Sequence, residues 1–199
     1  MLGRPDVDGD RWAVVGLGNP GARYSSTRHN AGAMVLEALL GRMESALKRH
    51  KSGCLTADGS LGGKSAILVR PASEMNNSGR PVAELLRWYK IDSARLVVIH
   101  DELDIPFGYV RVKLGGGTAG HNGLRSLVAH LHTNNFVRVR VGISRPSGRR
   151  DPVDYVLSDF SLSERKDLRD IVEQAADAVE RVLEAGPAVA MNEYNAGSR

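Results

Sequence analysis

The sequence predicts a single α/β domain in which a mixed, mostly parallel twisted sheet is flanked by helices on both faces. Segments typical of strands and of helices alternate along the 199 residues, which is the pattern of a covered sheet. The run at 95–100 has an unbroken apolar centre, as expected for a central strand. The runs at 109–114 and 137–143 alternate apolar residues with Arg or Lys, so each has one apolar and one basic face.

The remaining elements follow from local periodicity. The predicted strands are 12–17, 66–70, 95–100, 109–114 and 137–143. The predicted helices are 30–43, 79–90, 122–131 and 163–185. The third and fourth strands are joined too briefly for a helical crossover, so the sheet should be mixed. Ser161 and Glu164 have the spacing of a capping box before the last helix, and Gly186-Pro187 should end it.

Length and composition limit the class of protein. The chain fits one domain, residues 11–199, after a short flexible tail at 1–10. The tail lacks the apolar stretch of a signal peptide, and no run approaches the roughly 18 apolar residues of a membrane span. The single cysteine, Cys54, excludes a disulfide framework and a cysteine-based metal cluster. We therefore expect a cytoplasmic protein without membrane contact.

Charge is distributed unevenly along the chain. Residues 111–150 contain eight Lys or Arg and no Asp or Glu, whereas residues 151–199 contain five basic and eleven acidic residues. The basic segment could form a surface that follows phosphate groups, as in nucleic-acid-binding proteins. Its arginines could instead pair with the acidic C-terminal helix. The sequence pattern leaves both interpretations open.

Several polar side chains follow predicted strands on turn-prone, glycine-rich backbone. They are Asn19, Asn76, Asp101 and Asn122. Because loops at strand ends gather into one site in α/β proteins, we expect these side chains to converge. Each turn taken alone is ordinary turn chemistry, and Thr27 or Asn30 could simply cap the helix that follows.

Two nucleotide-binding motifs are excluded. Gly16, Gly18 and Gly21 formally match G-x-G-x-x-G, but Pro20 removes a backbone donor that a pyrophosphate would need. The acidic residue expected after the next strand is also absent. The glycine-rich segment 115–124 lacks the Lys-Ser/Thr ending of a phosphate-binding loop.

The expected catalytic pair is His29 with Asp101. A carboxylate that accepts a hydrogen bond from one imidazole nitrogen fixes the tautomer, leaves the other nitrogen as a base, and raises its pKa. No G-x-S-x-G nucleophile is present, so water is the expected nucleophile. Asparagines can bind a carbonyl or oxyanion without adding charge. His121 is the competing histidine, and we interpret it as structural.

A metal site is the alternative interpretation of D-E-L-D at 101–104. Three carboxylates lie close together in this segment. Hard cations bind carboxylates, but no His/Asp cluster at ligand spacing accompanies them. We therefore expect neither a metal nor a cofactor.

Four motifs together resemble those of bacterial peptidyl-tRNA hydrolases. They are V-G-L-G-N-P-G…Y-x-x-T-R-H-N-x-G, P-x-x-x-M-N-x-S-G, H-D-E-L-D-x-P-x-G and G-G-G-x-x-G-H-N-G-L. The resemblance extends in order from about residue 12 to about residue 195. It implies a single α/β domain with a mixed sheet. It also implies hydrolysis of the ester that joins a peptide to the 3′-terminal ribose of tRNA, by a cytoplasmic monomer with tRNA as its partner.

The resemblance also implies roles for individual residues. His29 is similar to the catalytic base and Asp101 to the carboxylate that stabilises it. The remaining matches are the substrate-positioning Asn19, Asn76 and Asn122, Tyr24 at the pocket for the tRNA end, and Lys113 and Arg140 at tRNA phosphate.

Two positions depart from the family pattern. Glu74 stands where the family usually has an aromatic residue, and Ala119 stands where a glycine is typical. Glu74 would place a negative charge near the substrate and could alter affinity or weaken activity. The alternative function is therefore a non-catalytic RNA-binding relative. The complete set of base, acid and asparagines favours the hydrolase.

Overall fold

A sheet of seven strands forms the centre of the computed structural model, which describes residues 10–196. Its strand order is β2-β3-β4-β1-β5-β7-β6. The strands are β1 (Trp12–Gly16), β2 (Lys48–Arg49), β3 (Cys54–Leu61), β4 (Lys64–Pro71), β5 (Leu96–Glu102), β6 (Val110–Leu114) and β7 (Val137–Gly142). The four central strands are parallel, whereas the β2–β3, β3–β4 and β6–β7 pairs are antiparallel. This confirms the predicted mixed, mostly parallel sheet.

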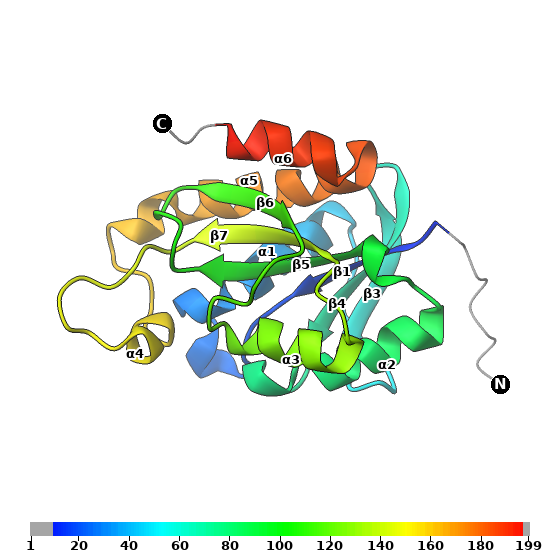
Figure 1. Ribbon diagram of the computed structural model, residues 1–199, viewed down its shortest axis with the longest axis horizontal. Helices are drawn as coiled ribbons and strands as arrows, with labels where there is room; N and C mark the ends of the chain where they lie inside the picture. Colours follow the sequence, from blue (N-terminus) through cyan, green and yellow to red (C-terminus); the bar gives the residue numbers. More distant parts are fainter. Residues whose placement is uncertain (1–9, 197–199) are drawn as a thin grey trace.

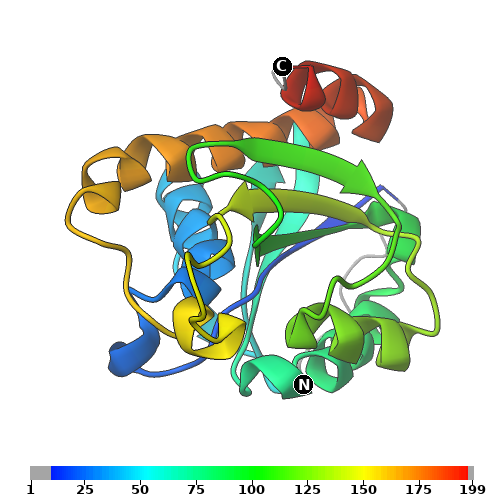
Figure 2. The ribbon, with the colours of Figure 1, turned by 60° about the vertical axis from the view of Figure 1, so that its left-hand side comes forward.

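Helices cover both faces of this sheet, as predicted (Figures 1 and 2). They are α1 (Ala31–Arg42), α2 (Gly79–Tyr89), α3 (Asn122–Leu131), α4 (Pro152–Val156), α5 (Glu164–Ala185) and α6 (Pro187–Asn195). α1 and α5 lie on one face, α2 and α3 lie on the other, and α6 packs along the edge strand β6. Short 3₁₀ helices lie between these elements at η1 (Ala22–Tyr24), η2 (Arg28–Asn30), η3 (Met75–Asn77) and η4 (Ser93–Arg95).

The sheet separates two apolar cores. Along β1, Val14 packs in the core beneath α1 and α5, whereas Ala13 and Val15 pack in the core beneath α2 and α3. On β6 and β7, Val112 and Val139 belong to the first of these cores. Because side chains alternate across a strand, the basic residues of β6 and β7 lie on the face that carries α3.

The N-terminal end of α1 lies very close to β1 and β5. Gly32 faces these strands, and a Cβ at this position would clash with the carbonyl oxygen of Ile99. The N–H of Leu17 donates to that carbonyl at 3.0 Å, and the N–H of Ala33 donates to the carbonyl of Leu17 at 2.9 Å. Glycine permits this approach, which brings the residues just before α1 to the carboxyl end of β5.

Among the strands and α-helices, four were absent from the predicted set, namely β2, β3, α4 and α6. β3 pairs with β4 along its whole length, but Asp58, Gly59 and Ser60 interrupt its apolar pattern and are exposed. α4 has five residues, which is too short for helical periodicity to register. Gly186 ends α5 as predicted, but Pro187 also begins α6, because proline suits the first position of a helix.

The predicted capping box is confirmed. The N–H of Glu164 donates to Ser161 Oγ at 3.3 Å, and the N–H of Ser161 donates to the Glu164 carboxylate at 2.6 Å. Within the predicted tail, residues 1–9 lie outside the described part of the chain, and Asp10 lies 3.9 Å from Arg95. Among the described residues, no helix has the length and apolar character needed to cross a membrane.

Candidate active site

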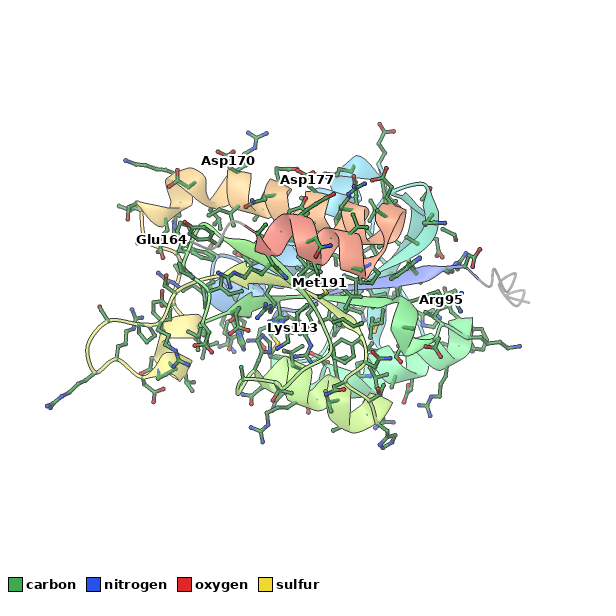
Figure 3. All side chains as sticks on the ribbon, turned by 45° about the horizontal axis from the view of Figure 1, so that its top comes forward. Arg95, Lys113, Glu164, Asp170, Asp177 and Met191 are labelled. Atoms are coloured by element: carbon green, nitrogen blue, oxygen red, sulfur yellow. The ribbon has the colours of Figure 1, made fainter. Side chains whose placement is uncertain are left out.

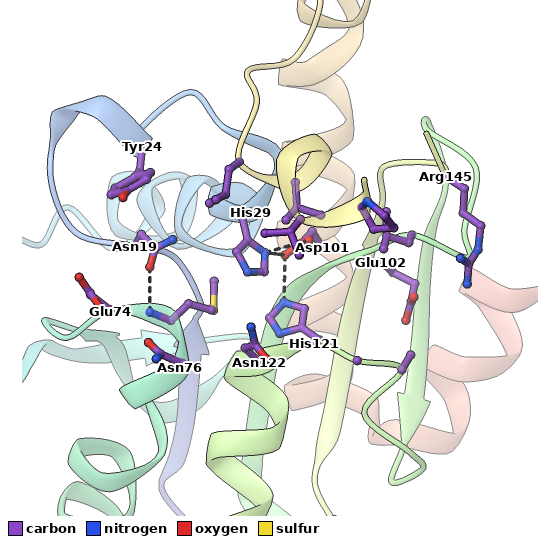
Figure 4. A pocket seen from close by; sticks show the side chains of 18 residues that line it. Asn19, Tyr24, His29, Glu74, Asn76, Asp101, Glu102, His121, Asn122 and Arg145 are labelled. Atoms are coloured by element: carbon purple, nitrogen blue, oxygen red, sulfur yellow. Dashed lines mark hydrogen bonds and ion pairs between the residues drawn. The ribbon is translucent and has the colours of Figure 1, made fainter. Parts of the chain in front are cut away.

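A cavity of about 440 Å³ opens near the carboxyl ends of β1, β4 and β5 (Figure 4). Its walls come from the turn after β1, η3, the end of β5, the glycine loop before α3, and α4. We call this cavity the cleft. It brings together seven of the sequence-predicted residues: Asn19, Tyr24, His29, Glu74, Asn76, Asp101 and Asn122.

His29 and Asp101 are in direct contact at the floor of the cleft. η2 places His29 immediately before α1, and Asp101 lies near the end of β5. His29 Nδ1 lies 2.9 Å from Oδ1 and 3.1 Å from Oδ2 of Asp101. Because Nδ1 donates to the carboxylate, the neutral imidazole keeps Nε2 as an acceptor. This geometry suits a general base with an orienting acid.

Burial and charge act in opposite directions on the two residues. Burial alone would lower the pKa of His29, but the charge and hydrogen bond of Asp101 outweigh it, and the pKa is raised. Burial alone would raise the pKa of Asp101, but the two neighbouring histidines hold it far below its usual range. Asp101 therefore stays ionised, and His29 is more basic than an ordinary histidine.

His121 shares the same carboxylate, which sequence reasoning missed. At the start of α3 its Nδ1 accepts a hydrogen bond from the N–H of Leu124 at 3.4 Å. A neutral His121 therefore carries its proton on Nε2, which lies 3.0 Å from Asp101 Oδ1. The helix-capping position fixes where the ring points. G-H-N before a predicted helix was the available sequence signal, and His121 both caps α3 and orients Asp101.

A third histidine, His100, lies behind this group. Its ring meets the ring of His121 edge-on at a centroid distance of 5.0 Å. Complete burial, together with the nearby His121, lowers the pKa of His100 to about 3. His100 therefore stays neutral at physiological pH and adds no charge beside Asp101.

Asn19 is held rigidly from two directions. The amide side chain of Asn30 brackets its backbone, accepting from the N–H of Asn19 at 2.8 Å and donating to its carbonyl at 3.0 Å. The side-chain oxygen of Asn19 accepts from the N–H of Met75 at 2.8 Å (Figure 4). Asn19 Nδ2 therefore remains as the donor that the side chain can offer to a ligand.

The helix-capping interpretation of Thr27 and Asn30 was wrong. Neither side chain makes a capping hydrogen bond at the helix it precedes. Thr27 Oγ1 donates to the carbonyl of Tyr24 at 2.8 Å instead. The amide of Asn30 is used to hold Asn19, so this residue belongs to the support of the site.

The rim of the cleft is polar. Asn76, Asn122 and Glu74 are exposed there, and Tyr24 is half-buried. The guanidinium of Arg23 lies 4.5 Å from the centroid of the Tyr24 ring. Within the described part of the chain, Glu74 forms no ion pair. The rim therefore carries an uncompensated negative charge.

Ala119 occupies a backbone conformation that favours glycine. Its φ is 47°, in the left-handed region, where a Cβ is disfavoured. The residue lies in the glycine loop and lines the cleft. The departure at this position therefore introduces backbone strain two residues before His121.

Lys113 and Arg140 lie outside the cleft, on a set of four cations. We call this set the basic face, and it consists of Arg111, Lys113, Arg138 and Arg140. In the β6–β7 pair, Arg111 is directly opposite Arg140 and Lys113 is directly opposite Arg138. Arg138 is buried and donates to the carbonyls of Gly116 and Gly117 at 2.7 Å and 2.5 Å. Arg138 thus holds the glycine loop, while Lys113 is exposed.

The basic segment is not neutralised by the C-terminal helix. Among the described Lys and Arg residues of 111–150, the one that forms an ion pair is Arg145, with Asp104. Three acidic residues of α5, Glu173, Asp177 and Glu180, instead pair with Arg42. Figure 3 shows Asp170 and Asp177 on α5, apart from Lys113 on β6. Of the two interpretations left open by the sequence, the pairing with the C-terminal helix is therefore wrong.

The carboxylates of D-E-L-D do not converge on a metal site. Asp104 pairs with Arg145 at 2.6 Å, away from Asp101. The expectation that no His/Asp cluster lies at ligand spacing was wrong, because His29, Asp101 and His121 have potential ligand atoms within 4.8 Å of one another. These atoms already form N–H···O hydrogen bonds with each other, so the trio is satisfied as a hydrogen-bonded group.

Comparison with known proteins identifies the family that this chain resembles in sequence and in fold. The family model described as peptidyl-tRNA hydrolase matches residues 13–199. Peptidyl-tRNA hydrolase of Frankia alni is 53% identical over 196 residues, which span 98% of this chain and 99% of that protein. The Mycolicibacterium smegmatis protein of the same name is 52% identical over 184 residues, spanning 92% and 96%. A crystal structure of peptidyl-tRNA hydrolase from Acinetobacter baumannii has a TM-score of 0.87 at 35% identity, covering 94% of this chain and 95% of that one.

These matches extend over nearly the whole chain in sequence and in fold. The residues that the family model matches, 13–199, include all four motifs on which the resemblance was based, and the resemblance is confirmed. The chain belongs to the peptidyl-tRNA hydrolase family.

Proposed function

We propose that this protein hydrolyses the ester bond between a peptidyl or N-blocked aminoacyl group and the 3′-terminal ribose of tRNA. The observation that carries the proposal is the contact of His29 Nδ1 with Asp101 at 2.9 Å, in a cleft lined by three asparagines. Membership of the family supports the same reaction. The cellular role is the recycling of tRNA from peptidyl-tRNA that is released prematurely.

His29 is the general base of the proposed mechanism. Its Nε2 takes a proton from a water molecule in the cleft, and the water oxygen bonds to the ester carbonyl carbon. The tetrahedral oxyanion then collapses, the bond to the ribose oxygen breaks, and that oxygen receives the proton from His29. Asp101 holds the imidazole orientation and stabilises the imidazolium between the two steps.

The asparagines bind the substrate on either side of the reacting ester. Since the oxygen of Asn19 is engaged by Met75, its Nδ2 donates to a peptide carbonyl or to the developing oxyanion. Asn76 in η3 and Asn122 at the start of α3 lie on two elements that contact each other at the rim of the cleft. They contact the peptidyl group and the RNA end, and Tyr24 lines the place of the terminal nucleotide.

The basic face binds tRNA phosphate through Lys113 and Arg140. Its cations lie on two adjacent strands without a carboxylate partner among the described residues. Burial lowers the pKa of Arg140, an effect that Glu102 opposes and Arg111 reinforces. A phosphate would relieve this electrostatic cost by supplying the missing negative charge.

The enzyme is proposed to act without a metal or other cofactor, as a cytoplasmic monomer. The hydrogen bonds within the histidine–aspartate group support the first point. A free, buried Cys54 is typical of a reducing compartment. The amide of Asn195 bonds both backbone groups of Val112 at 3.0 Å and 2.8 Å. This contact covers part of the edge strand β6, where another copy could otherwise pair.

One assay tests the proposed reaction. Purified protein is incubated with N-acetyl-aminoacyl-tRNA, and release of free tRNA is measured, with the unblocked aminoacyl-tRNA as the control. We expect turnover of the blocked substrate and little turnover of the unblocked one. Binding of the blocked tRNA without turnover would contradict the hydrolase and support a non-catalytic RNA-binding protein.

A further inference from the structure

One wall of the cleft is apolar and comes from α4 and the residue after it. Its members are Pro152, Val153, Val156 and Leu157. Val153 is 60% exposed and Leu157 is 39% exposed. The opposite walls present asparagines and histidines. We call these four residues the apolar wall. A substrate side chain in the cleft can be buried against it.

A single buried arginine, Arg28, fastens the segment that carries this wall. Its Nη1 donates to Ser158 Oγ at 2.9 Å, to the Ser158 carbonyl at 3.3 Å and to the Asp159 carbonyl. Its Nη2 donates to Glu164 at 2.6 Å, and its side chain is 6% exposed. Because Glu164 also caps α5, Arg28 connects the segment after α4 to a rigid helix.

Arg28 also packs against α4 itself. Its guanidinium lies 4.3 Å from the centroid of the Tyr155 ring. The hydroxyl of Tyr155 donates to the carbonyl of Ile143 at 2.6 Å, at the point where the chain leaves β7. A desolvated guanidinium over an aromatic face is among the stronger cation–π arrangements. Arg28 therefore holds the end of the segment that forms the apolar wall directly, and its start through Tyr155.

This side chain belongs to the residue next to the catalytic base. The backbone N–H of Arg28 donates to the Ser158 carbonyl at 3.1 Å, and Thr27 forms a bridge with Asp159. His29 follows in the same 3₁₀ turn. The position of the apolar wall relative to the reacting ester is therefore fixed by contacts of Thr27 and Arg28, the two residues that precede the base.

We propose that Arg28 is a positioning residue that fixes the apolar wall over the cleft, and that this wall selects peptidyl groups with an apolar side chain next to the scissile ester. The inference rests on the proposed hydrolysis of peptidyl-tRNA. An apolar side chain gains by leaving water against Val153, Val156 and Leu157. It gains nothing if the wall is displaced.

The test compares two substrates that differ only in that side chain, N-acetyl-leucyl-tRNA and N-acetyl-glycyl-tRNA charged on tRNAs with the same acceptor stem. For the wild type, we expect kcat/KM to favour the leucyl substrate by about 10-fold. In Arg28→Lys the ratio should fall toward one through a higher KM for the leucyl substrate. The kcat for the glycyl substrate and the acid limb of its pH profile should stay unchanged, since the contact of His29 with Asp101 is intact.

Arg165→Gln is the matched control. Arg165 donates to the Phe160 carbonyl and to Asp159 in the same segment, but it is 45% exposed and does not stack on Tyr155. Its replacement should leave the leucyl-to-glycyl ratio unchanged. Val153→Ser weakens the apolar wall without touching the arginine, and should lower the ratio as Arg28→Lys does.

Three results would overturn the inference. The first is an unchanged ratio in folded Arg28→Lys with only a lower melting temperature, which marks a purely structural residue. The second is an equal loss of kcat on both substrates, which makes Arg28 a support of His29 instead. The third is an unchanged ratio in Val153→Ser.

If the wild type hydrolyses neither substrate, the proposed function fails, and hydrogen exchange then tests whether Arg28 fixes the apolar wall. Exchange at residues 152–157 must be faster in Arg28→Lys than in Arg165→Gln.

Discussion

The buried charge in the cleft has its partners within the protein, whereas the charges of the basic face do not. In the cleft, the buried Asp101 receives N–H donors from two histidines. On the basic face, like charges are directly opposite one another on β6 and β7. Among the described residues, no hydrogen-bond partner is found for the buried Nε atoms of Arg111, Arg138 and Arg140. A group that orients a base needs its partners in place beforehand, whereas a surface that binds an anion leaves the counter-charge to the ligand.

The largest expected effect comes from removing the base in the cleft. His29→Ala should lower kcat for N-acetyl-aminoacyl-tRNA on the order of 10²- to 10⁴-fold, because general-base catalysis is lost. Folding stability should change little, since Asp101 keeps its hydrogen bond to His121. Circular dichroism and thermal melting check the fold, and His132→Asn, at the exposed end of α3, is the control. A residual rate above a few per cent of the wild-type rate would show that another group is the base.

Asp101→Asn should reduce the rate less, on the order of 10- to 1000-fold. In the wild type the rate falls with decreasing pH as His29 is protonated, and the raised pKa places this limb above that of an ordinary histidine. The charge of Asp101 causes the increase, while burial opposes it. Without that charge, the limb should move to lower pH. A full pH profile of kcat/KM measures the shift, and an unchanged profile would refute the pairing of the two residues.

Replacing a cation of the basic face should weaken tRNA binding without destabilising the fold. Lys113→Gln and Arg140→Gln should each flatten the dependence of log K on log salt by somewhat less than one unit. Each should also raise the free energy of unfolding by about 0.2–1 kcal/mol, since like charges opposite one another are destabilising. Filter binding across a salt series and urea unfolding measure the two quantities.

The control for these variants is Arg181→Gln, which removes the same charge from a residue paired with Glu184 and Glu193. This change should leave the salt slope unaltered and should not increase stability. A slope that is unchanged after removal of both Lys113 and Arg140 would mean that the basic face does not contact phosphate.

The sequence was sufficient to predict the parts of the site that follow from strand ends. Asn19, Asn76 and Asp101 each follow or end a strand of the sheet, and adjacent parallel strands bring their carboxyl ends to one edge. His29 could be paired with Asp101 because both lie in the motifs at strand ends, and a carboxylate beside an imidazole is the usual arrangement of a general base. The close approach allowed by Gly32 makes the contact short, and this required the structure.

Other parts could not be predicted because their signals are not local. His121 shares Asp101 only because a capping bond to Leu124 turns its ring toward the cleft. Arg28 is an unremarkable basic residue in the sequence, and its burial depends on partners about 130 positions away. α4 is held by these contacts and by Tyr155 rather than by helical periodicity, so neither the helix nor the apolar wall was expected.

The smallest effects concern how residues of the cleft distinguish a blocked amino group of the substrate from a free one. A peptidyl group presents a neutral amide near the ester, whereas an ordinary aminoacyl-tRNA presents an ammonium group. Asn19 Nδ2 can donate to the carbonyl of the blocking group, so loss of this donor should lower the preference for blocked substrates. Asn19→Asp keeps an acceptor for the N–H of Met75, whereas Asn19→Ala loses that contact as well. Both should lower the blocked-to-unblocked ratio, and only Asn19→Ala should also loosen η3.

Glu74 acts on the same ratio from the opposite direction. Its exposed carboxylate has no ion-pair partner among the described residues, so it should attract the ammonium group of an unblocked substrate. Glu74→Gln and Glu74→Phe should therefore both raise the blocked-to-unblocked ratio of kcat/KM, by about threefold for an exposed and solvent-screened charge. The effect of Glu74→Gln should disappear at high salt, whereas any additional gain in Glu74→Phe should persist, because an apolar ring contact is not screened. A ratio that stays constant across the Asn19 and Glu74 variants would show that neither residue distinguishes an amide from an ammonium. The role of His29, His121 and Asp101 at the floor of the cleft would then be limited to hydrolysis of the ester.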